Sequence, residues 1–577
     1  MKSCHKFLYC TLILLQVASM ADGQLHATDK PEFSREKVYV HLDKTVLVAG
    51  ETLQYKVYTS NSESKVLYFM LLGRGPAPAL QWRINLHQGS SAGKYQLPAD
   101  LEPGYYELCA YTNRMRSGSF DHVYRQPLLV ESLTKKTTDT LYIPATPATQ
   151  KTLPEGPAVK PSLVVNTAKA FYRPGETVEL EISAENLSRD ETADLSIAAK
   201  EQVPFKDILR ERTIAEQFFL FSEPAGVAGS PAIESGPCKT TVENKGFMLV
   251  GHVSDAAGGV SSLQGIILSV ADSSAAHMLF ARTDADGRFT FYLDRFYDNR
   301  DLILQVTGNR SSPKKWVIEN KRMERGKADF DEFEISDEAS AWIENKKELS
   351  LIEAVYRTPE ATRTKDVSVA AMNYFTPPDY LIIPSDYANL VNFREIADNI
   401  LPTVKYAMRN KVYTVQIFIP FADAWFESDM ILLNGVPFTD LGYLATLGSK
   451  DISRIEVIAS NFLLGDITYN GLLSVYTHDG KIAPNYLKNH CYTWKNEVSQ
   501  TNPGEAIPGA TASPSSDPHI PDFRSVLYWD PGVKIQGELK KTIKFKASQM
   551  TGLYQVVVCG LSSGDYPLHA TTSFEVK

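Results

Sequence analysis

Val40-His-Leu-Asp-Lys-Thr-Val-Leu-Val-Ala-Gly-Glu-Thr-Leu-Gln-Tyr-Lys-Val-Tyr-Thr-Ser-Asn61 and Val165-Asn-Thr-Ala-Lys-Ala-Phe-Tyr-Arg-Pro-Gly-Glu-Thr-Val-Glu-Leu-Glu-Ile-Ser-Ala-Glu-Asn186 follow one pattern, 125 residues apart. When the two stretches are aligned, Lys44 falls on Lys169, and Gly50-Glu-Thr falls on Gly175-Glu-Thr. After each triplet the apolar residues alternate with polar ones, which is the pattern of a half-buried β-strand, and the glycine predicts a turn before it. The repeat therefore predicts an array of β-sandwich modules, which bind or space other molecules more often than they catalyse reactions.

The first 23 residues have the pattern of a secretory signal peptide. Lys2 and Lys6 precede an apolar run that ends near Leu15, and small residues follow around Ala21. The apolar run is shorter than the roughly 18–20 residues that a membrane-spanning helix needs. We therefore expect an exported protein whose contact with a membrane goes through a partner.

Composition narrows the class of protein further. The net charge of −9 and the pI near 5.8 argue against a nucleic-acid partner, which requires a basic face. Cys109, Cys238, Cys491 and Cys559 lie far apart and in no C-x-x-C pair, so no zinc site is expected. Cys109 and Cys559 lie on alternating strands and are predicted to be buried thiols, although the sequence leaves the pairing of all four cysteines open.

At about 100–200 residues per domain, a chain of 577 residues should fold into several domains. The expected class is mainly β, with tandem immunoglobulin-like sandwiches and one small α+β domain. Strand patterns, turn residues and Pro-rich stretches predict these segments: a signal peptide at 1–23, a sandwich at 34–132, a linker at 133–161, a second sandwich with a helical insertion at 162–245, a third sandwich at 246–322, a charged bridge at 323–377, an α+β domain at 378–482, a linker at 483–520 and a C-terminal β module at 521–577.

Several of these segments resemble known families. The two Gly-Glu-Thr units resemble the second-domain type of macroglobulin module, and residues 246–320, with Gly251-His-Val253, resemble the carboxypeptidase-regulatory-like sandwich. Residues 429–477, with Asn434-Gly-Val-Pro437 and Arg454-Ile-Glu-Val457, resemble the plug of TonB-dependent receptors. In this order, and with the tail from Pro521, the modules are similar to multi-domain cell-envelope proteins of Bacteroidota.

The resemblance implies an envelope protein whose plug-like domain has no barrel of its own. A 22-stranded barrel needs roughly 220 residues or more, and 96 residues follow Lys481. The sequence also contains no Cys-Gly-Glu-Gln motif, so the covalent trapping of some macroglobulins is not expected. The implied location is the periplasm or the outer membrane.

The sequence offers weak candidates for catalysis or metal binding. Gly89-Ser-Ser91-Ala-Gly93 matches a nucleophile motif by its letters, but we expect it in a hairpin loop rather than at a strand-to-helix elbow. Asp284-Ala-Asp-Gly287 is predicted to be a turn, because Arg295 stands where a calcium loop needs a glutamate. There is no H-E-x-x-H motif, and His41 is expected to be a partly exposed strand residue. We therefore predict no catalytic, cofactor-binding or metal-binding residues.

Six residues are candidates for contact with other molecules. The pairs Trp425-Phe426 and Tyr528-Trp529 could form a docking or sugar-stacking face, although aromatic residues of a sandwich core would have the same pattern. Asn434-Gly435 predicts a hairpin turn, and in plug-like domains this region also packs against a partner wall.

The leading hypothesis is a non-enzymatic envelope protein that acts as a docking scaffold or accessory subunit for an outer-membrane barrel, assembly or export complex. The alternative is a module that captures a glycan or a peptide for a TonB-dependent transporter. A hydrolase would require a catalytic triad that the sequence does not provide.

Overall fold

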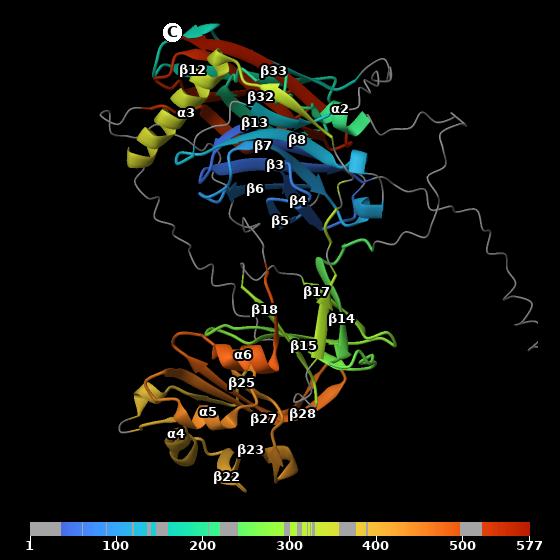
Figure 1. Cartoon of the computed structure of the whole chain (residues 1–577), viewed down its shortest axis with the longest axis vertical. Helices are drawn as coiled ribbons and strands as arrows, with labels where there is room; N and C mark the ends of the chain where they lie inside the picture. Colours follow the sequence, from blue (N-terminus) through green and yellow to red (C-terminus); the bar gives the residue numbers. More distant parts are fainter. Residues whose placement is uncertain are drawn as a thin grey trace, which may run out of the picture.

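The computed structural model describes residues 36–577 except 61, 88, 118–119, 136–139, 146–159, 206, 220–240, 294–299, 309–313, 320, 324, 326–328, 357–376, 388–389 and 497–521. The predicted signal peptide lies outside the described residues, as does Cys238. The described residues fold mainly into β-sheets, as the sequence predicts. They form three β-sandwiches and one α+β module (Figure 1).

Sandwich 1 comprises residues 36–132 and lies within the range predicted for the first sandwich. Its smaller sheet has the order β1-β3-β6, and its larger sheet has the order β2-β8-β7-β4-β5. The strands are Lys37–Leu42 (β1), Val46–Val48 (β2), Thr52–Ser60 (β3), Val66–Leu72 (β4), Leu80–Asn85 (β5), Ser90–Gln96 (β6), Gly104–Tyr111 (β7) and Tyr124–Glu131 (β8).

Sandwich 2 repeats this topology strand for strand. Its sheets have the orders β10-β12-β31 and β11-β33-β32-β13-β30, which match those of sandwich 1 when β10 corresponds to β1. The strands are Ser162–Thr167 (β10), Phe171–Tyr172 (β11), Thr177–Glu185 (β12), Thr192–Glu201 (β13), Val526–Gln536 (β30), Lys541–Lys546 (β31), Gly552–Ser562 (β32) and Pro567–Val576 (β33).

This topology corrects two predicted boundaries. The segments predicted as a second sandwich at 162–245 and a separate C-terminal module at 521–577 are two halves of one domain. Strand β13 pairs with β32 on one side and β30 on the other, so its partners lie more than 320 residues further along the chain. One buried core joins the two halves. The segment between Glu201 and Val526 connects β13 to β30. It is therefore inserted at the place where sandwich 1 has the short connection between β4 and β5.

The repeated Gly-Glu-Thr segment builds the same turn in both sandwiches. Gly50 and Gly175 have φ values of +90° and +75°, which glycine adopts without strain. The Lys44 ammonium lies 2.7 Å from the Glu51 carboxylate, and the Lys169 ammonium lies 2.5 Å from that of Glu176. Each carboxylate also accepts a backbone N–H of the turn, from Val48 and Arg173 respectively. The duplicated sequence therefore encodes a duplicated turn that ends in a strand.

Sandwich 3 and the α+β module form the other half of the molecule (Figure 1). Sandwich 3 has sheets of order β17-β14-β19 and β16-β15-β18-β29. Its strands are Phe247–Asp255 (β14), Gly265–Val270 (β15), His277–Arg282 (β16), Arg288–Leu293 (β17), Leu302–Val306 (β18), Lys314–Ile318 (β19) and Tyr492–Trp494 (β29). Strand β29 comes from the predicted linker at 483–520, so this part of the linker is a sheet edge.

The α+β module comprises residues 377–490, close to the range predicted for the plug-like domain. A five-stranded sheet, β21-β27-β28-β25-β26, carries a second sheet, β22-β23-β24, and three helices. The elements are Tyr380–Ile382 (β21), Phe393–Ile400 (α4), Val404–Arg409 (β22), Val412–Ile419 (β23), Ala424–Glu427 (β24), Ile431–Leu433 (β25), Val436–Pro437 (β26), Leu441–Thr446 (α5), Ile452–Leu464 (β27), Ile467–Thr477 (β28) and Pro484–His490 (α6).

The predicted linker at 133–161 and the charged bridge at 323–377 also contain structure. Thr140–Pro144 (β9) pairs with Phe330–Glu334 (β20), and the helix Asp337–Tyr356 (α3) follows. Ala339 and Ile343 of α3 are buried against Val46 of sandwich 1 and Phe205, which follows β13. Helix α3 therefore packs at the junction between sandwiches 1 and 2.

A buried polar cluster joins the two halves of the molecule. Glu243, which is fully buried, accepts hydrogen bonds from the Tyr68 hydroxyl and the Met248 backbone N–H and pairs with Lys321. Beside it, the Arg83 guanidinium of sandwich 1 lies 3.8 Å from the centre of the Phe247 ring. Removing either member of such a buried pair leaves an uncompensated charge, which costs about 3–5 kcal/mol.

The joining of residues 192–201 to the C-terminal strands is testable with Gly560. A Cβ at this position would lie 2.0 Å from the Asp194 carbonyl oxygen on β13. We expect Gly560→Ala to destabilise sandwich 2 by about 1–3 kcal/mol, with faster amide hydrogen exchange at residues 192–201.

The matched control is Gly532→Ala, because a Cβ there meets nothing closer than 3.6 Å. An increase in exchange confined to residues 522–577 of Gly560→Ala would contradict the single-domain description.

Candidate functional site

Sandwiches 1 and 2 face one another through β1 and β3 on one side and β13, β32 and β33 on the other. The register places Ser196, Cys559 and His569 side by side across sandwich 2, and Lys200 beside Gln555. Opposite them, His41 lies beside Lys56 on sandwich 1. The contact between the sandwiches is therefore polar in large part, although much of it is buried.

The centre of this contact contains a serine–histidine pair. The Nδ1 atom of His41 lies 2.7 Å from the Ser196 hydroxyl, which also accepts a hydrogen bond from the Tyr58 hydroxyl at 2.9 Å. His41 and Ser196 are 1% and 0% exposed. His41 was predicted to be partly exposed, and that prediction is wrong because its strand faces a second sandwich.

The geometry of this pair differs from that of a catalytic triad. In a triad, a carboxylate orients the histidine nitrogen that faces away from the serine. Here Nε2 of His41 has no hydrogen-bond partner among the described residues, and the Trp529 ring packs beside the imidazole with 5.2 Å between ring centres. The burial of the serine and the histidine denies access to a substrate. The pair holds the two sandwiches together.

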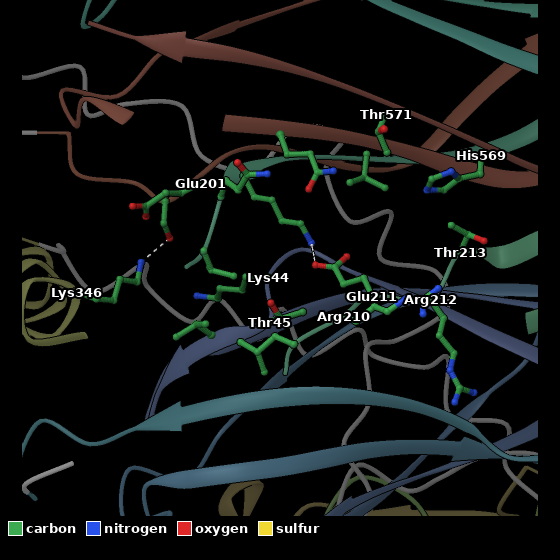
Figure 2. A pocket seen from close by; sticks show the side chains of 18 of the residues that line it. Lys44, Thr45, Glu201, Arg210, Glu211, Arg212, Thr213, Lys346, His569 and Thr571 are labelled. Atoms are coloured by element: carbon green, nitrogen blue, oxygen red, sulfur yellow. Dashed lines mark hydrogen bonds and ion pairs between the residues drawn. The ribbon is translucent and has the colours of Figure 1, made fainter. Parts of the chain in front are cut away.

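A cavity of about 420 Å³ opens beside this contact (Figure 2). Its walls come from both sandwiches, from the segment 209–213 and from α3. Strands β32 and β33 contribute Gln555, Val557, His569 and Thr571, all of which lie on the face that is turned toward sandwich 1. The volume lies in the range of about 300–1,000 Å³ that small-molecule sites have.

The charged groups around the cavity are largely paired with one another. The Lys200 ammonium lies 2.6 Å from the Glu211 carboxylate (Figure 2), and Lys44 pairs with Glu51. Arg210 pairs with Glu216. The Arg212 side chain runs away from the Lys200–Glu211 pair (Figure 2), and burial lowers its pKa. Three of the five basic side chains that line the cavity therefore have a carboxylate partner.

Several polar groups at the cavity lack a partner. One carboxylate oxygen of Glu201 is buried without a hydrogen bond, whereas the other accepts the Trp342 indole N–H at 3.1 Å. Burial raises the pKa of Glu201 and lowers that of His569. The side chains of Gln555, His569 and Thr571 form no hydrogen bond within the described part of the chain. The sequence alone does not identify these positions, because they come to lie on one face only when strands that are distant in the sequence pair.

Most of the six predicted contact residues are used within the chain. Tyr528 is buried in sandwich 2, and Trp529, which is 0% exposed, faces His41 of sandwich 1. Phe426 packs on the core of the α+β module. These three positions are unsuited to contact with another molecule, because their strands are covered on the faces concerned.

The Asn434-Gly435 turn contacts sandwich 3. Both residues have positive φ, +48° and +78°, in the tight turn between β25 and β26 that the sequence predicts. The Asn434 carbonyl accepts the Asp272 backbone N–H at 2.9 Å, and a Cβ on Gly435 would lie 3.1 Å from the Ala276 Cα. The wall that this turn meets therefore belongs to the same chain.

Trp425 differs from Phe426, which is also partly exposed, because it does not pack on the core of the α+β module. It lies on the outer face of the β22-β23-β24 sheet, opposite Phe418 on the neighbouring strand, with 5.4 Å between the ring centres. The Lys405 ammonium lies 3.7 Å from the Trp425 ring centre. This residue remains a candidate for contact with a partner.

The weaker chemical candidates have local structural roles. Ser91 is on β6 and donates to the Asn85 carbonyl at 2.8 Å; the predicted hairpin loop is wrong, because β5 and β6 belong to different sheets. Asp284-Ala-Asp-Gly287 is a turn, as predicted, in which Asp284 accepts the Asp286 and Arg288 backbone N–H groups. The thiols of Cys109 and Cys559 are buried, also as predicted, and burial raises the pKa of both.

The described segments lack two features. No group of three or more His, Cys, Asp or Glu side chains there is placed to hold a metal ion. Among the helices that the structure describes, none has the length and hydropathy needed to cross a bilayer.

Comparisons with known proteins found matches among solved structures alone. No family model matches the chain, and no curated protein does. Solved structures that are similar include Salmonella alpha-2-macroglobulin reacted with methylamine and trypsin-activated alpha-2-macroglobulin from Escherichia coli, each with 8% identity and a TM-score of 0.22. Both matches cover 94% of this chain, which spans 39% and 42% of those two chains. The β-sandwich class of this chain rests on the sheets described above.

The buried His41 predicts a loss of stability in acid. Burial lowers the pKa of His41 well below that of an exposed histidine, about 6.5, so only the unfolded chain binds this proton in mild acid. The contribution of His41 is therefore present above pH 6.5 and is lost as the pH falls below it, by at most about 1.4 kcal/mol per pH unit. We expect the stability difference between wild type and His41→Gln to shrink between pH 7 and pH 5 in urea unfolding. The exposed His87, replaced by Gln, is the control, and parallel curves for wild type and His41→Gln would contradict the prediction.

Proposed function

We propose that this protein is a non-enzymatic adaptor of the bacterial cell envelope, in which the α+β module docks an envelope protein and the sandwiches hold it at a distance. One observation carries the proposal: the α+β module holds half of the large exposed apolar side chains of the described residues. These nine are Leu381, Ile383, Tyr387, Val391, Met408, Val412, Phe421, Tyr443 and Leu463. The module has only about a quarter of the described residues. Concentrated exposed apolar surface is typical of an interaction site.

Three of these nine side chains belong to the β22-β23-β24 sheet and its turns, and the outer face of this sheet is the docking surface that we propose. Val412 and Arg409 lie opposite one another near the β22–β23 turn, and Phe418 and Trp425 lie opposite one another near the other end. Phe421, in the short turn Pro420–Ala422 beyond β23, is fully exposed. Aromatic side chains provide much contact area for a small loss of side-chain entropy, and they are enriched at interfaces.

The charge of this surface suggests the chemistry of its partner. Strand β22 is an edge of its sheet, and Lys405, Arg409 and Lys411 lie on it or in the turn that follows. None of these three forms an ion pair with a residue that the structure describes. An exposed edge can accept another strand through its backbone groups. The partner that fits is an extended apolar segment with acidic residues, presented by an outer-membrane protein or an envelope complex.

We also propose that the protein is exported and that it belongs to the cell envelope of a Bacteroidota bacterium. The amino-terminal sequence has the pattern of a signal peptide, and the order of modules resembles large envelope proteins of that group. The pairing of sandwiches 1 and 2 supports a role as a spacer, because their contact is extensive and buried.

Site-specific photo-crosslinking tests the docking surface in the intact cell. A benzoylphenylalanine residue in place of Phe421 should give one discrete adduct with an envelope protein, whereas the same residue in place of Leu539, exposed on sandwich 2, should not. The double charge reversal Arg409→Glu and Lys411→Glu should weaken the adduct at least about tenfold, equal to about 1.4 kcal/mol.

The matched control is Lys534→Glu with Lys546→Glu, two exposed lysines on sandwich 2. The proposal fails if Phe421 and Leu539 give the same adducts, or if both charge reversals act alike.

A further inference from the structure

We propose that the cavity between sandwiches 1 and 2 binds a neutral, polyhydroxylated ligand of mono- or disaccharide size. This binding role goes beyond docking by the α+β module, because it uses a different part of the molecule. The cavity measures about 420 Å³ and opens to solvent beside the contact of the two sandwiches (Figure 2).

Three hydrogen-bonding side chains that line the cavity have no partner among the described residues; Gln555 and His569 are partly exposed and Thr571 is exposed. Gln555 is beside Lys200 on the neighbouring strand, and Thr571 and His569 follow on β33. An amide, a hydroxyl and a neutral imidazole each both donate and accept hydrogen bonds. Hydroxyl groups of a ligand do the same, so a polyol can satisfy these groups in either direction.

The Glu201 carboxylate positions an aromatic side chain at the cavity. Its Oε2 atom is buried and unpartnered, although a buried polar atom without a hydrogen bond costs about 1–3 kcal/mol. Its Oε1 atom accepts the Trp342 N–H, which fixes the carboxylate and the indole at one end of the cavity. The partly buried Trp342 indole at the same end offers an apolar surface to the C–H groups of a sugar ring.

The ion pairs of Lys200 and Lys44 argue for a neutral ligand. Lys200 and Lys44 already have carboxylate partners, Glu211 and Glu51, at 2.6 and 2.7 Å. An anion would have to separate one of these pairs, whereas a hydroxyl can donate to the carboxylate or accept from the ammonium without doing so. Lys346 donates to the Ser525 hydroxyl at 2.6 Å, which is a further contact of α3 with sandwich 2.

The position of the cavity gives the binding a structural consequence. The groups that would contact the ligand belong to sandwich 1, both halves of sandwich 2 and α3. Because the ligand would bind these parts only when they are assembled, it should stabilise the assembled state over the separated one.

Saturation-transfer NMR on the full chain tests the proposal. The probes are glucose, galactose, mannose, N-acetylglucosamine, maltose and cellobiose, each tested separately, together with inorganic phosphate and acetate. Saturation transfer is preferable to a melting curve alone, because excluded sugars stabilise proteins without binding. We expect at least one saccharide to bind in a saturable way, and the double variant Gln555→Ala with Thr571→Ala to weaken that binding at least tenfold.

The matched control removes one amide and one hydroxyl elsewhere on sandwich 2, in Gln536→Ala with Thr542→Ala, and should bind as the wild type does. Absence of saturable binding by every saccharide would overturn the proposal. So would equal binding by the two double variants, or displacement of the saccharide by phosphate or acetate, which would make the cavity an anion site.

Discussion

Strand β13 imposes the constraint on which the rest of the structure depends. It lies inside a five-stranded sheet, and both neighbours, β30 and β32, come from the C-terminal segment. Sandwich 2 therefore cannot close until the chain has returned from the whole insertion, so the two ends of the insertion must lie close together. The structure meets this condition where the Glu201 backbone N–H donates to the Ser525 carbonyl at 2.7 Å. Within the insertion, the segment that forms sandwich 3 and the α+β module starts and ends at Phe247 and Trp494, whose rings stack with 6.0 Å between centres.

The same junction determines how rigidly the two halves are joined. Arg83 of sandwich 1 covers the Phe247 ring and donates to the Asn496 side chain, so one residue contacts both the start and the end of the segment that forms sandwich 3 and the α+β module. Glu243 is buried beside it and is surrounded by donors, which offset the cost of removing its charge from water. Since a buried charged cluster keeps its partners only in one arrangement, the α+β module is held at a defined distance from the sandwich pair (Figure 1). A spacer requires this property.

The sequence predicts what is local and misses what is distant. Gly50 and Gly175 identify their turns because the positive φ is a property of single residues, and the Lys44–Glu51 spacing recurs because both members lie on one turn. In contrast, the alternation in β13 predicts a buried strand without naming its partner, and Ser196 pairs with Cys559, 363 residues away. The short strands β9 and β29 lie in segments whose composition resembles linkers, and only tertiary pairing makes them strands. For the same reason, the pattern of aromatic residues does not distinguish the buried Trp529 from the partly exposed Trp425.

The α+β module has one surface that contacts sandwich 3 and another that we propose as the docking surface for a partner. The Asn434-Gly435 turn and Arg454, which donates to the Ser273 and Ser274 carbonyls, are used against sandwich 3. These hydrogen bonds join the module to backbone groups of sandwich 3. The surface that makes them is therefore occupied and cannot bind another protein. In the described part of the chain, the outer face of the β22-β23-β24 sheet has no such cover, and Val412 and Phe421 remain exposed. The contact with sandwich 3 therefore leaves this face available for the proposed docking.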